Sequence, residues 1–149
     1  MERQNITLFV VNLYKSLVKD RILIFAIVIV SLLTISNVAN KIFLGFEPLQ
    51  YSFFSYDKIL HLLSSIIIVR FLYRFITLLE SPYEINHPRL VASILALIIY
   101  GLICEPFELF TFVIQESHSD QFLSEVFDVP FDWLWDAAGV LLSYILGYD

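Results

Sequence analysis

Four apolar segments dominate this sequence, and each approaches the length of about 20 residues that a helix needs to cross a bilayer core. They are residues 22–39, 59–79, 90–114 and 131–148. Hydrophobic residues make up 58% of the 149-residue chain, a share above that of typical soluble domains. Backbone polar groups in lipid must pair within their own segment, so we expect each segment to be a helix. The sequence therefore predicts an all-α, integral membrane four-helix bundle that forms a single domain over residues 1–149.

The segment before the first span, residues 1–21, has a different character. Its apolar residues recur at helical spacing between Phe9 and Val18, and Lys15 and Lys19 stand among and after them. This pattern is typical of a helix that lies in the membrane interface with its apolar face toward the acyl chains. We therefore predict an N-terminal amphipathic interfacial helix before the four spans.

Lysine and arginine residues divide unequally between the two ends of the predicted spans. Seven of the nine precede the first span or surround the turn between the second and third spans, while Lys41 and Lys58 fall in the first connection. Because cytoplasmic loops carry the excess of cations, both termini are predicted to be cytoplasmic in a multi-pass protein of the cell membrane. The net charge of −6 and the lack of a basic patch argue against nucleic acid as a partner.

Ionisable residues gather where the last three predicted spans meet the outer surface. Each of these helix ends carries a pair spaced three or four residues apart, so both members share one helix face. The three pairs are Asp57 with His61, Glu105 with Glu108, and Asp132 with Asp136. With the predicted topology they lie at a similar depth, and we expect them to meet in one pocket.

Helical steps of about 100° per residue predict which faces turn inward. Lys58 is expected to point away from the Asp57–His61 face. Asp128 lies one turn before Asp132, but Pro130 disfavours helix at Val129 and would allow Asp128 to fold over the site, so the sequence leaves the placement of Asp128 open. We expect Arg70 and Arg74 to extend to the inner headgroups. The inward face of the last span is predicted to contain Asp132, Asp136, Gly139, Ser143 and Gly147, and that of the third span Ile94, Leu97, Gly101, Glu105 and Glu108, opposite Ala92 and Ala96.

Five carboxylates crowded at low dielectric repel one another unless some are protonated or a cation lies among them. Carboxylate oxygens with one imidazole suit a divalent metal: Mg²⁺, Mn²⁺, Ca²⁺ or Zn²⁺. In this interpretation His61, oriented by Asp57, is a catalytic base or a fifth ligand. The predicted metal ligands are Glu105, Glu108, Asp132 and Asp136. A structural hydrogen-bond network at the membrane border is the alternative.

The order of these motifs resembles a known family. YDKILH at 56–61, EPFE at 105–108 and DVPFDWLWDAAG at 128–139 resemble the YjdF-like membrane proteins and, more loosely, the VanZ-like proteins. In the VanZ-like pattern the second motif usually reads Asp-Glu-x-x-Gln, and Asn stands where this chain has Asp136. The resemblance covers about the last ninety residues. It implies a bacterial or archaeal cell-membrane protein with an outward polar site; VanZ-like members are associated with envelope glycopeptide resistance.

Three functions are compatible with these features. The first is a metal-dependent enzyme that acts on membrane lipid headgroups or lipid-linked envelope intermediates at the outer leaflet. The second is a small accessory or structural subunit without catalysis, whose acids pair with cations of partner membrane subunits. The third is ion or proton passage, which needs polar groups through the whole bilayer, and the inner parts of spans three and four offer few. The sequence leaves open whether the chain is an enzyme.

Overall fold

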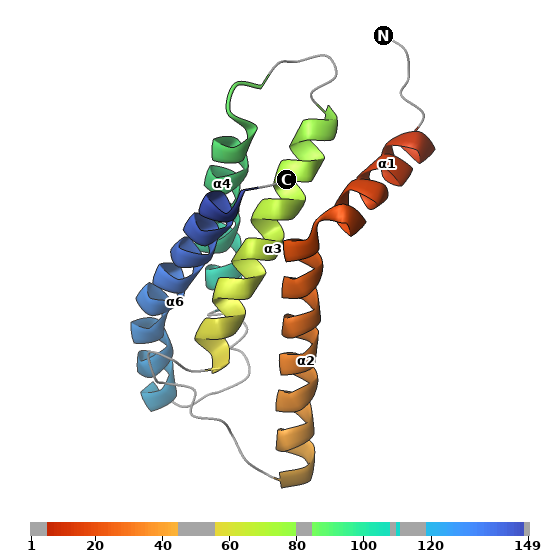
Figure 1. Ribbon diagram of the computed structural model, residues 1–149. Coiled ribbons are helices and arrows are strands. Elements are labelled where there is room, and N and C mark those ends of the chain that lie inside the picture. The colour runs from red at the N-terminus through yellow and green to blue at the C-terminus, as the bar shows by residue number, and fades with distance from the viewer. Residues whose placement is uncertain (1–5, 45–55, 80–84, 108–109, 111–118, 148–149) are drawn as a thin grey trace.

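The computed structural model describes residues 6–44, 56–79, 85–107, 110 and 119–147. These residues form helices and their short connections, with no strand among them (Figure 1), which confirms the all-α prediction for this part of the chain. The elements are α1 (Ile6–Lys19), α2 (Arg21–Leu44), α3 (Tyr56–Leu79), α4 (Pro88–Ile99), the π-helix η1 (Tyr100–Cys104) and α6 (Ser119–Leu146).

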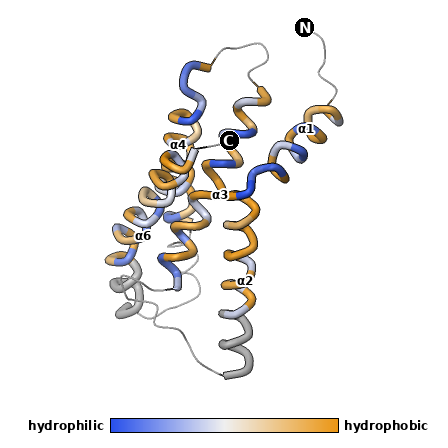
Figure 2. Tube along the Cα trace, viewed as in Figure 1, coloured by the Kyte–Doolittle hydropathy of each residue, from blue (hydrophilic) through white to orange (hydrophobic). Residues whose placement is uncertain are grey.

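Three helical stretches are long and apolar enough to cross a membrane. They are Tyr56–Leu79, Pro88–Phe107 and Val126–Leu146, and α2 adds a shorter apolar stretch, Arg21–Ser36. Figure 2 shows apolar residues along most of the described part of α2 as well as along the three longer stretches. The chain is therefore a membrane protein with three candidate spans in its described residues.

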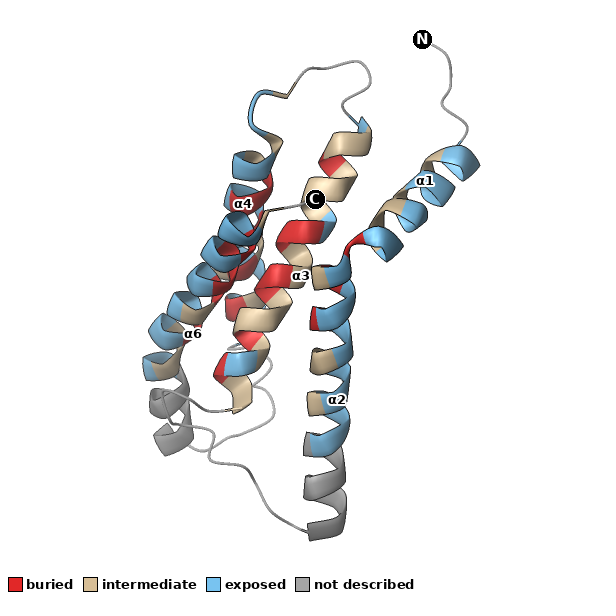
Figure 3. Cartoon of the chain, viewed as in Figure 1, coloured by how far each residue is buried: buried red, intermediate tan, exposed pale blue. Residues whose placement is uncertain are grey.

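Helix α3 is the centre of the arrangement and contacts α1, α2, α4 and α6. Buried positions recur along α3, whereas α1 and the far side of α2 are largely exposed (Figure 3). Hydrogen bonds join α3 to α6 and to Gly147, which follows α6. In these bonds the two residues are 70 to 77 positions apart in the sequence. This nearly constant offset means that the two helices run parallel, so the start of α3 lies beside the start of the spanning part of α6.

Helices α3 and α6 approach each other closely at Gly139. A Cβ atom on Gly139 would lie 2.9 Å from the Ser65 Cβ and would collide with the carbonyl oxygen of Leu62. Small residues allow helix backbones to approach in this way. The predicted inward face of the last span is confirmed for Asp132, Asp136, Gly139 and Ser143, which are buried. Gly147 instead follows the helix end with a φ of 73°, a left-handed conformation that favours glycine.

The predicted inward face of the third span is wrong for α4. Ala92, Ala96 and Tyr100 are buried there, while Ile94 and Leu97 are 49% and 42% exposed. Alanine at the contact lets α4 approach its neighbours, and the larger side chains face outward, as suits a lipid environment. The hydrophobic core of the bundle contains Val69, Ile76, Ala92, Ala96 and Val140.

A change of helical period brings Glu105 onto this same alanine face. Ala92, Ala96 and Tyr100 are spaced by four, and the next turn is the π-helix η1, in which the Glu105 N–H donates to the Tyr100 carbonyl five residues back. The additional residue in that turn places Glu105, which is buried, below Tyr100. Pro106 follows at once and has no N–H to donate to an α-helical turn. Helical steps of 100° therefore fail beyond Tyr100.

The last helix also begins earlier than predicted. Helix α6 starts at Ser119 and continues through Pro130, so Asp128 and Val129 are helical, and the expectation that Pro130 keeps Val129 out of the helix is wrong. A proline inside a helix forfeits one backbone hydrogen bond but does not always end the helix. As a result Asp128 lies one turn before Asp132 on α6.

A buried ion pair between Asp20 and Arg70 joins the α1–α2 junction to α3. Asp20 lies between α1 and α2 and caps α2, because its carboxylate accepts a hydrogen bond from the Leu23 N–H at 3.0 Å. Arg70 Nη1 donates to both Asp20 carboxylate oxygens at 2.7 Å, and Arg74 Nη2 donates at 3.3 Å. Arg70 also donates to the Gly147 carbonyl. The prediction that Arg70 and Arg74 extend to the headgroups is therefore wrong, because a buried partner holds both.

Asp20 remains ionised in this setting. Burial favours the neutral acid, but the Leu23 hydrogen bond and the bonds and charges of Arg70 and Arg74 outweigh it. The pKa of the Asp20 carboxyl is consequently held below its ordinary value of 3.8. A charged, paired Asp20 thus links the N-terminal helix to the centre of the bundle.

Candidate metal centre

The ionisable residues of α3, η1 and α6 converge where α3 begins. The first part of this cluster surrounds the ammonium group of Lys58, which is 1% exposed. Lys58 Nζ donates to Asp128 at 2.7 Å, to Asp57 at 3.2 Å and to Asp132 through a short contact. The prediction that Lys58 points away from the site is wrong, since three carboxylates from two helices surround it.

His61 lies one turn along α3 from Asp57 and faces two groups of carboxylates. Its Nδ1 is 3.2 Å from Asp136 Oδ1 and 3.5 Å from Glu105 Oε1. Its Nε2 is 3.6 Å from Asp132 and 3.9 Å from Asp57. We call the His61–Glu105–Asp136 set the inner group and the Asp57–His61–Asp132 set the outer group.

Each group is compact enough to hold a metal ion. Within each set the ligand atoms lie within 4.8 Å of one another, and all three residues of the inner group are buried. In the outer group Asp57 is half-buried, and Asp57 and Asp132 already bind the Lys58 ammonium. In the inner group His61 Nδ1 lies 3.2 Å from Asp136 Oδ1, and the buried Asp136 Oδ2 has no hydrogen-bond partner among the described residues. The inner group is therefore the better candidate for a cation.

Asp136 carries the most informative atom of the site. Its Oδ1 accepts a hydrogen bond from Ser65 at 2.7 Å and lies against His61, yet its Oδ2 has no hydrogen-bond partner among the described residues. Asp136 is 1% exposed. A buried carboxylate oxygen without a partner is costly unless a proton, a water molecule or a cation meets it.

The secondary structure explains how these side chains are placed. On α6, Asp128, Asp132 and Asp136 are spaced by four, so they form one row along the helix. On α3, Asp57 and His61 have the same spacing, and the parallel direction of α3 and α6 sets the two rows side by side. Glu105 joins them from the end of η1, because the π-turn directs it to the face that packs on α3 and α6.

The structure brings together five of the six predicted site residues. Asp57, His61, Glu105, Asp132 and Asp136 all belong to the two groups. The sixth, Glu108, lies outside the described residues. The roles assigned to these residues as metal ligands or catalytic groups stay predictions.

The sequence analysis missed Ser65, misplaced Lys58 and left the placement of Asp128 open. Asp128 had a usable signal, since it continues the four-residue spacing of Asp132 and Asp136. Ser65 follows His61 by four residues and was detectable in the same way. Lys58 had none, because it neighbours Asp57 and lies about 100° away around an ideal helix. Its long side chain reaches the acids from there.

Comparison of the chain with protein-family models, with curated proteins and with solved structures gives no match. The resemblance to YjdF-like and VanZ-like proteins therefore stays a prediction, and the geometry of the site carries the functional argument.

Proposed function

We propose that this chain is a multi-span membrane protein that binds a divalent cation in the inner group, between His61, Glu105 and Asp136. The observation that carries the proposal is the buried Asp136 Oδ2, which lacks a hydrogen-bond partner among the described residues, beside two further potential ligands. A cation among these atoms would complete the bonding of Asp136 and offset the excess negative charge of the cluster.

The distances within the inner group fit this proposal. Ligand atoms that bind one ion at about 2.0–2.2 Å lie roughly 3.3–3.6 Å apart in tetrahedral geometry and roughly 2.8–3.1 Å apart in octahedral geometry. The His61 Nδ1 distances to Asp136 and Glu105 are 3.2 Å and 3.5 Å. One imidazole with two carboxylates suits Mn²⁺ or Zn²⁺ better than Ca²⁺, which takes six to eight oxygen ligands.

The membrane arrangement proposed around this site adds α2 as a fourth span and α1 as an interfacial helix. The apolar stretch Arg21–Ser36 and the amphipathic pattern of α1 support this topology. The excess of cations on the N-terminal side supports cytoplasmic termini and a site that faces the outer leaflet. A bound cation there would polarise a phosphoryl or carbonyl oxygen of a lipid headgroup or a lipid-linked envelope intermediate, with His61 as one of its ligands and Asp57 beside the imidazole.

Titration of metal-free protein in detergent with Mn²⁺ or Zn²⁺, followed by calorimetry, tests the cation site. We expect one site per chain, and we expect Glu105→Gln and Asp136→Asn each to weaken binding at least tenfold because each removes a ligand charge. Asp128→Asn is the matched control, since Asp128 lies in the same row of α6 but binds Lys58. It should retain the stoichiometry and most of the affinity.

Two results would refute the proposal. One is an absence of binding to correctly folded wild-type protein, which would favour the structural network. The other is an equal effect of Asp128→Asn and Asp136→Asn, which would mean that general negative charge, and not the inner group, attracts the ion.

A further inference from the structure

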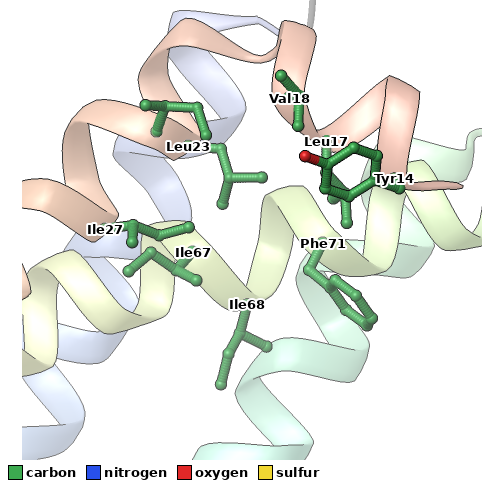
Figure 4. A pocket seen from close by; sticks show the side chains of 9 residues that line it. Tyr14, Leu17, Val18, Leu23, Ile27, Ile67, Ile68 and Phe71 are labelled. Atoms are coloured by element: carbon green, nitrogen blue, oxygen red, sulfur yellow. The ribbon is translucent and has the colours of Figure 1, made fainter.

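An apolar cavity of about 340 Å³ lies where α1, α2 and α3 meet. Each helix contributes three lining residues, among them Leu17, Leu23, Ile27, Ile67, Ile68 and Phe71 (Figure 4). The surface of the cavity is wholly apolar. Ile27 and Phe71 are each 41% exposed, so the cavity opens at the surface of the bundle. Its volume is at the low end of the range for ligand pockets, about 300–1,000 Å³.

The charged residues beside this cavity are all of one sign where they are exposed. Residues 6–36 contain four charged residues. Lys15, Lys19 and Arg21 are exposed. The single acid, Asp20, is buried and bonded to Arg70. Although the chain has a net charge of −6, the exposed charged residues among the described residues 6–36, which include six that line the cavity, are all cationic.

We infer that this cavity binds part of one acyl chain of an anionic phospholipid, whose headgroup lies against Lys15, Lys19 and Arg21. An apolar cavity alone would accept any lipid tail or an apolar helix. The adjoining cations select a ligand with an apolar chain and a negative head. The inference is independent of the cation site, because the cavity shares no residue with the inner or outer group.

The internal pairing of Asp20 favours an anionic headgroup beside the cavity. If Asp20 were exposed, its charge would repel an anionic headgroup at the same junction. Its bonds to Arg70 and Arg74 withdraw it from the surface and leave the three cations dominant. The α1–α2 junction is thereby suited to an anionic headgroup.

Photolabelling of the wild-type protein provides the first test. Protein is reconstituted in vesicles with phosphatidylglycerol that carries a diazirine in its acyl chain, and labelled peptides are identified by mass spectrometry. We expect labelling concentrated on the cavity residues of α2 and α3, and several-fold less with the matching phosphatidylcholine probe. Equal labelling by both probes, or labelling of Leu141 and Ile145 on α6 at the same level, would overturn the inference.

Variants test the chain and headgroup contacts separately. Ile27→Trp should fill the cavity and abolish the concentrated labelling. Ile35→Trp places the same residue two turns along α2, where it lines no part of the cavity, and should change nothing. Replacing Lys15, Lys19 and Arg21 with Gln should weaken phosphatidylglycerol retention in native mass spectrometry roughly fivefold per cation. Arg89→Gln removes a distant exposed cation as the control.

The remaining outcomes are equally decisive. Unchanged lipid retention in the triple Gln variant would overturn the headgroup assignment. A protein dimer that excludes the probe from the cavity would show that a second copy of the chain is the occupant. If Ile27→Trp does not fold, the wild-type photolabelling pattern decides alone.

Discussion

Replacement of Asp20 by Asn tests whether the buried ion pair at the α1–α2 junction holds the N-terminal helices on α3. Asp20 and Arg70 are each 1% exposed, and two hydrogen bonds of 2.7 Å join them. Asparagine is a good N-cap residue, so the bond from Leu23 survives while the charge is lost. Removal of one partner from a buried pair costs about 3–5 kcal/mol, because the guanidinium is left uncompensated. Asp20→Ala also loses the cap and should cost about 1 kcal/mol more.

Unfolding by dodecyl sulfate in mixed micelles, followed by far-ultraviolet circular dichroism, measures these changes in the free energy of unfolding. Arg70→Met is the companion variant, since it removes the other charge of the pair. The double variant, Asp20→Asn with Arg70→Met, should be less destabilised than the sum of the two single changes, because neither charge is then stranded. A cost below about 1 kcal/mol for Asp20→Asn, or strictly additive single changes, would refute the reasoning by placing the pair among weak surface interactions.

Three further predictions follow from the described contacts. The pKa of Asp20 is lowered on folding, so the contribution of its charge to stability is complete above the unfolded-state pKa of about 3.9 and is lost as the pH falls through the lower native pKa. The difference in the free energy of unfolding between wild type and Asp20→Asn should therefore stay constant from pH 5 to 7 and shrink below pH 4. A constant difference down to pH 2 would contradict this prediction. Lys58→Met removes the one ammonium group bound to three carboxylates, so it should lower the melting temperature without metal and increase the rise that Mn²⁺ produces in a thermal-shift assay; an unchanged response to Mn²⁺ would count against the site. Gly139→Ala directs a methyl group at the Leu62 carbonyl and should cost about 1–3 kcal/mol in the same unfolding assay, whereas Ala138→Leu at an exposed neighbouring position should be nearly neutral.

The sequence was sufficient to predict the parts of the site that follow a regular helical period. Asp132 and Asp136 on α6 share a face because they are four residues apart, and Asp57 and His61 on α3 do so for the same reason. Their convergence followed from the order of apolar segments, since alternating spans bring the relevant ends to one level. Carboxylates are also costly against lipid, which predicts that Asp136 turns inward, and it is buried.

Helical periodicity does not predict how far a long side chain extends or which residues form ion pairs between helices. Lys58 lies about 100° around α3 from Asp57, but its four-carbon side chain is long enough to bring the ammonium group to the acids, and the residue is buried there. Arg70 is buried because Asp20, about fifty positions away, supplies a charge that also caps α2. Neither pairing has a periodic signature, and each depends on how the helices pack. Both residues were therefore assigned to the surface by rules that treat each helix separately.

Glu105 was correctly predicted to belong to the site, although the inward face predicted for its helix was wrong. A uniform helical period puts Glu105 on the same face as Ile94 and Leu97. Because a carboxylate is costly against lipid, the whole of that face was predicted to point inward. In the structure Ile94 and Leu97 face outward, and the π-turn at Tyr100–Cys104 alone rotates Glu105 toward His61. A π-turn interrupts the regular α-helical hydrogen bonding and frequently occurs at functional sites. Its position directly before Glu105 brings that carboxylate into the inner group, and Pro106, which has no N–H to donate, disfavours a regular α-turn at this point.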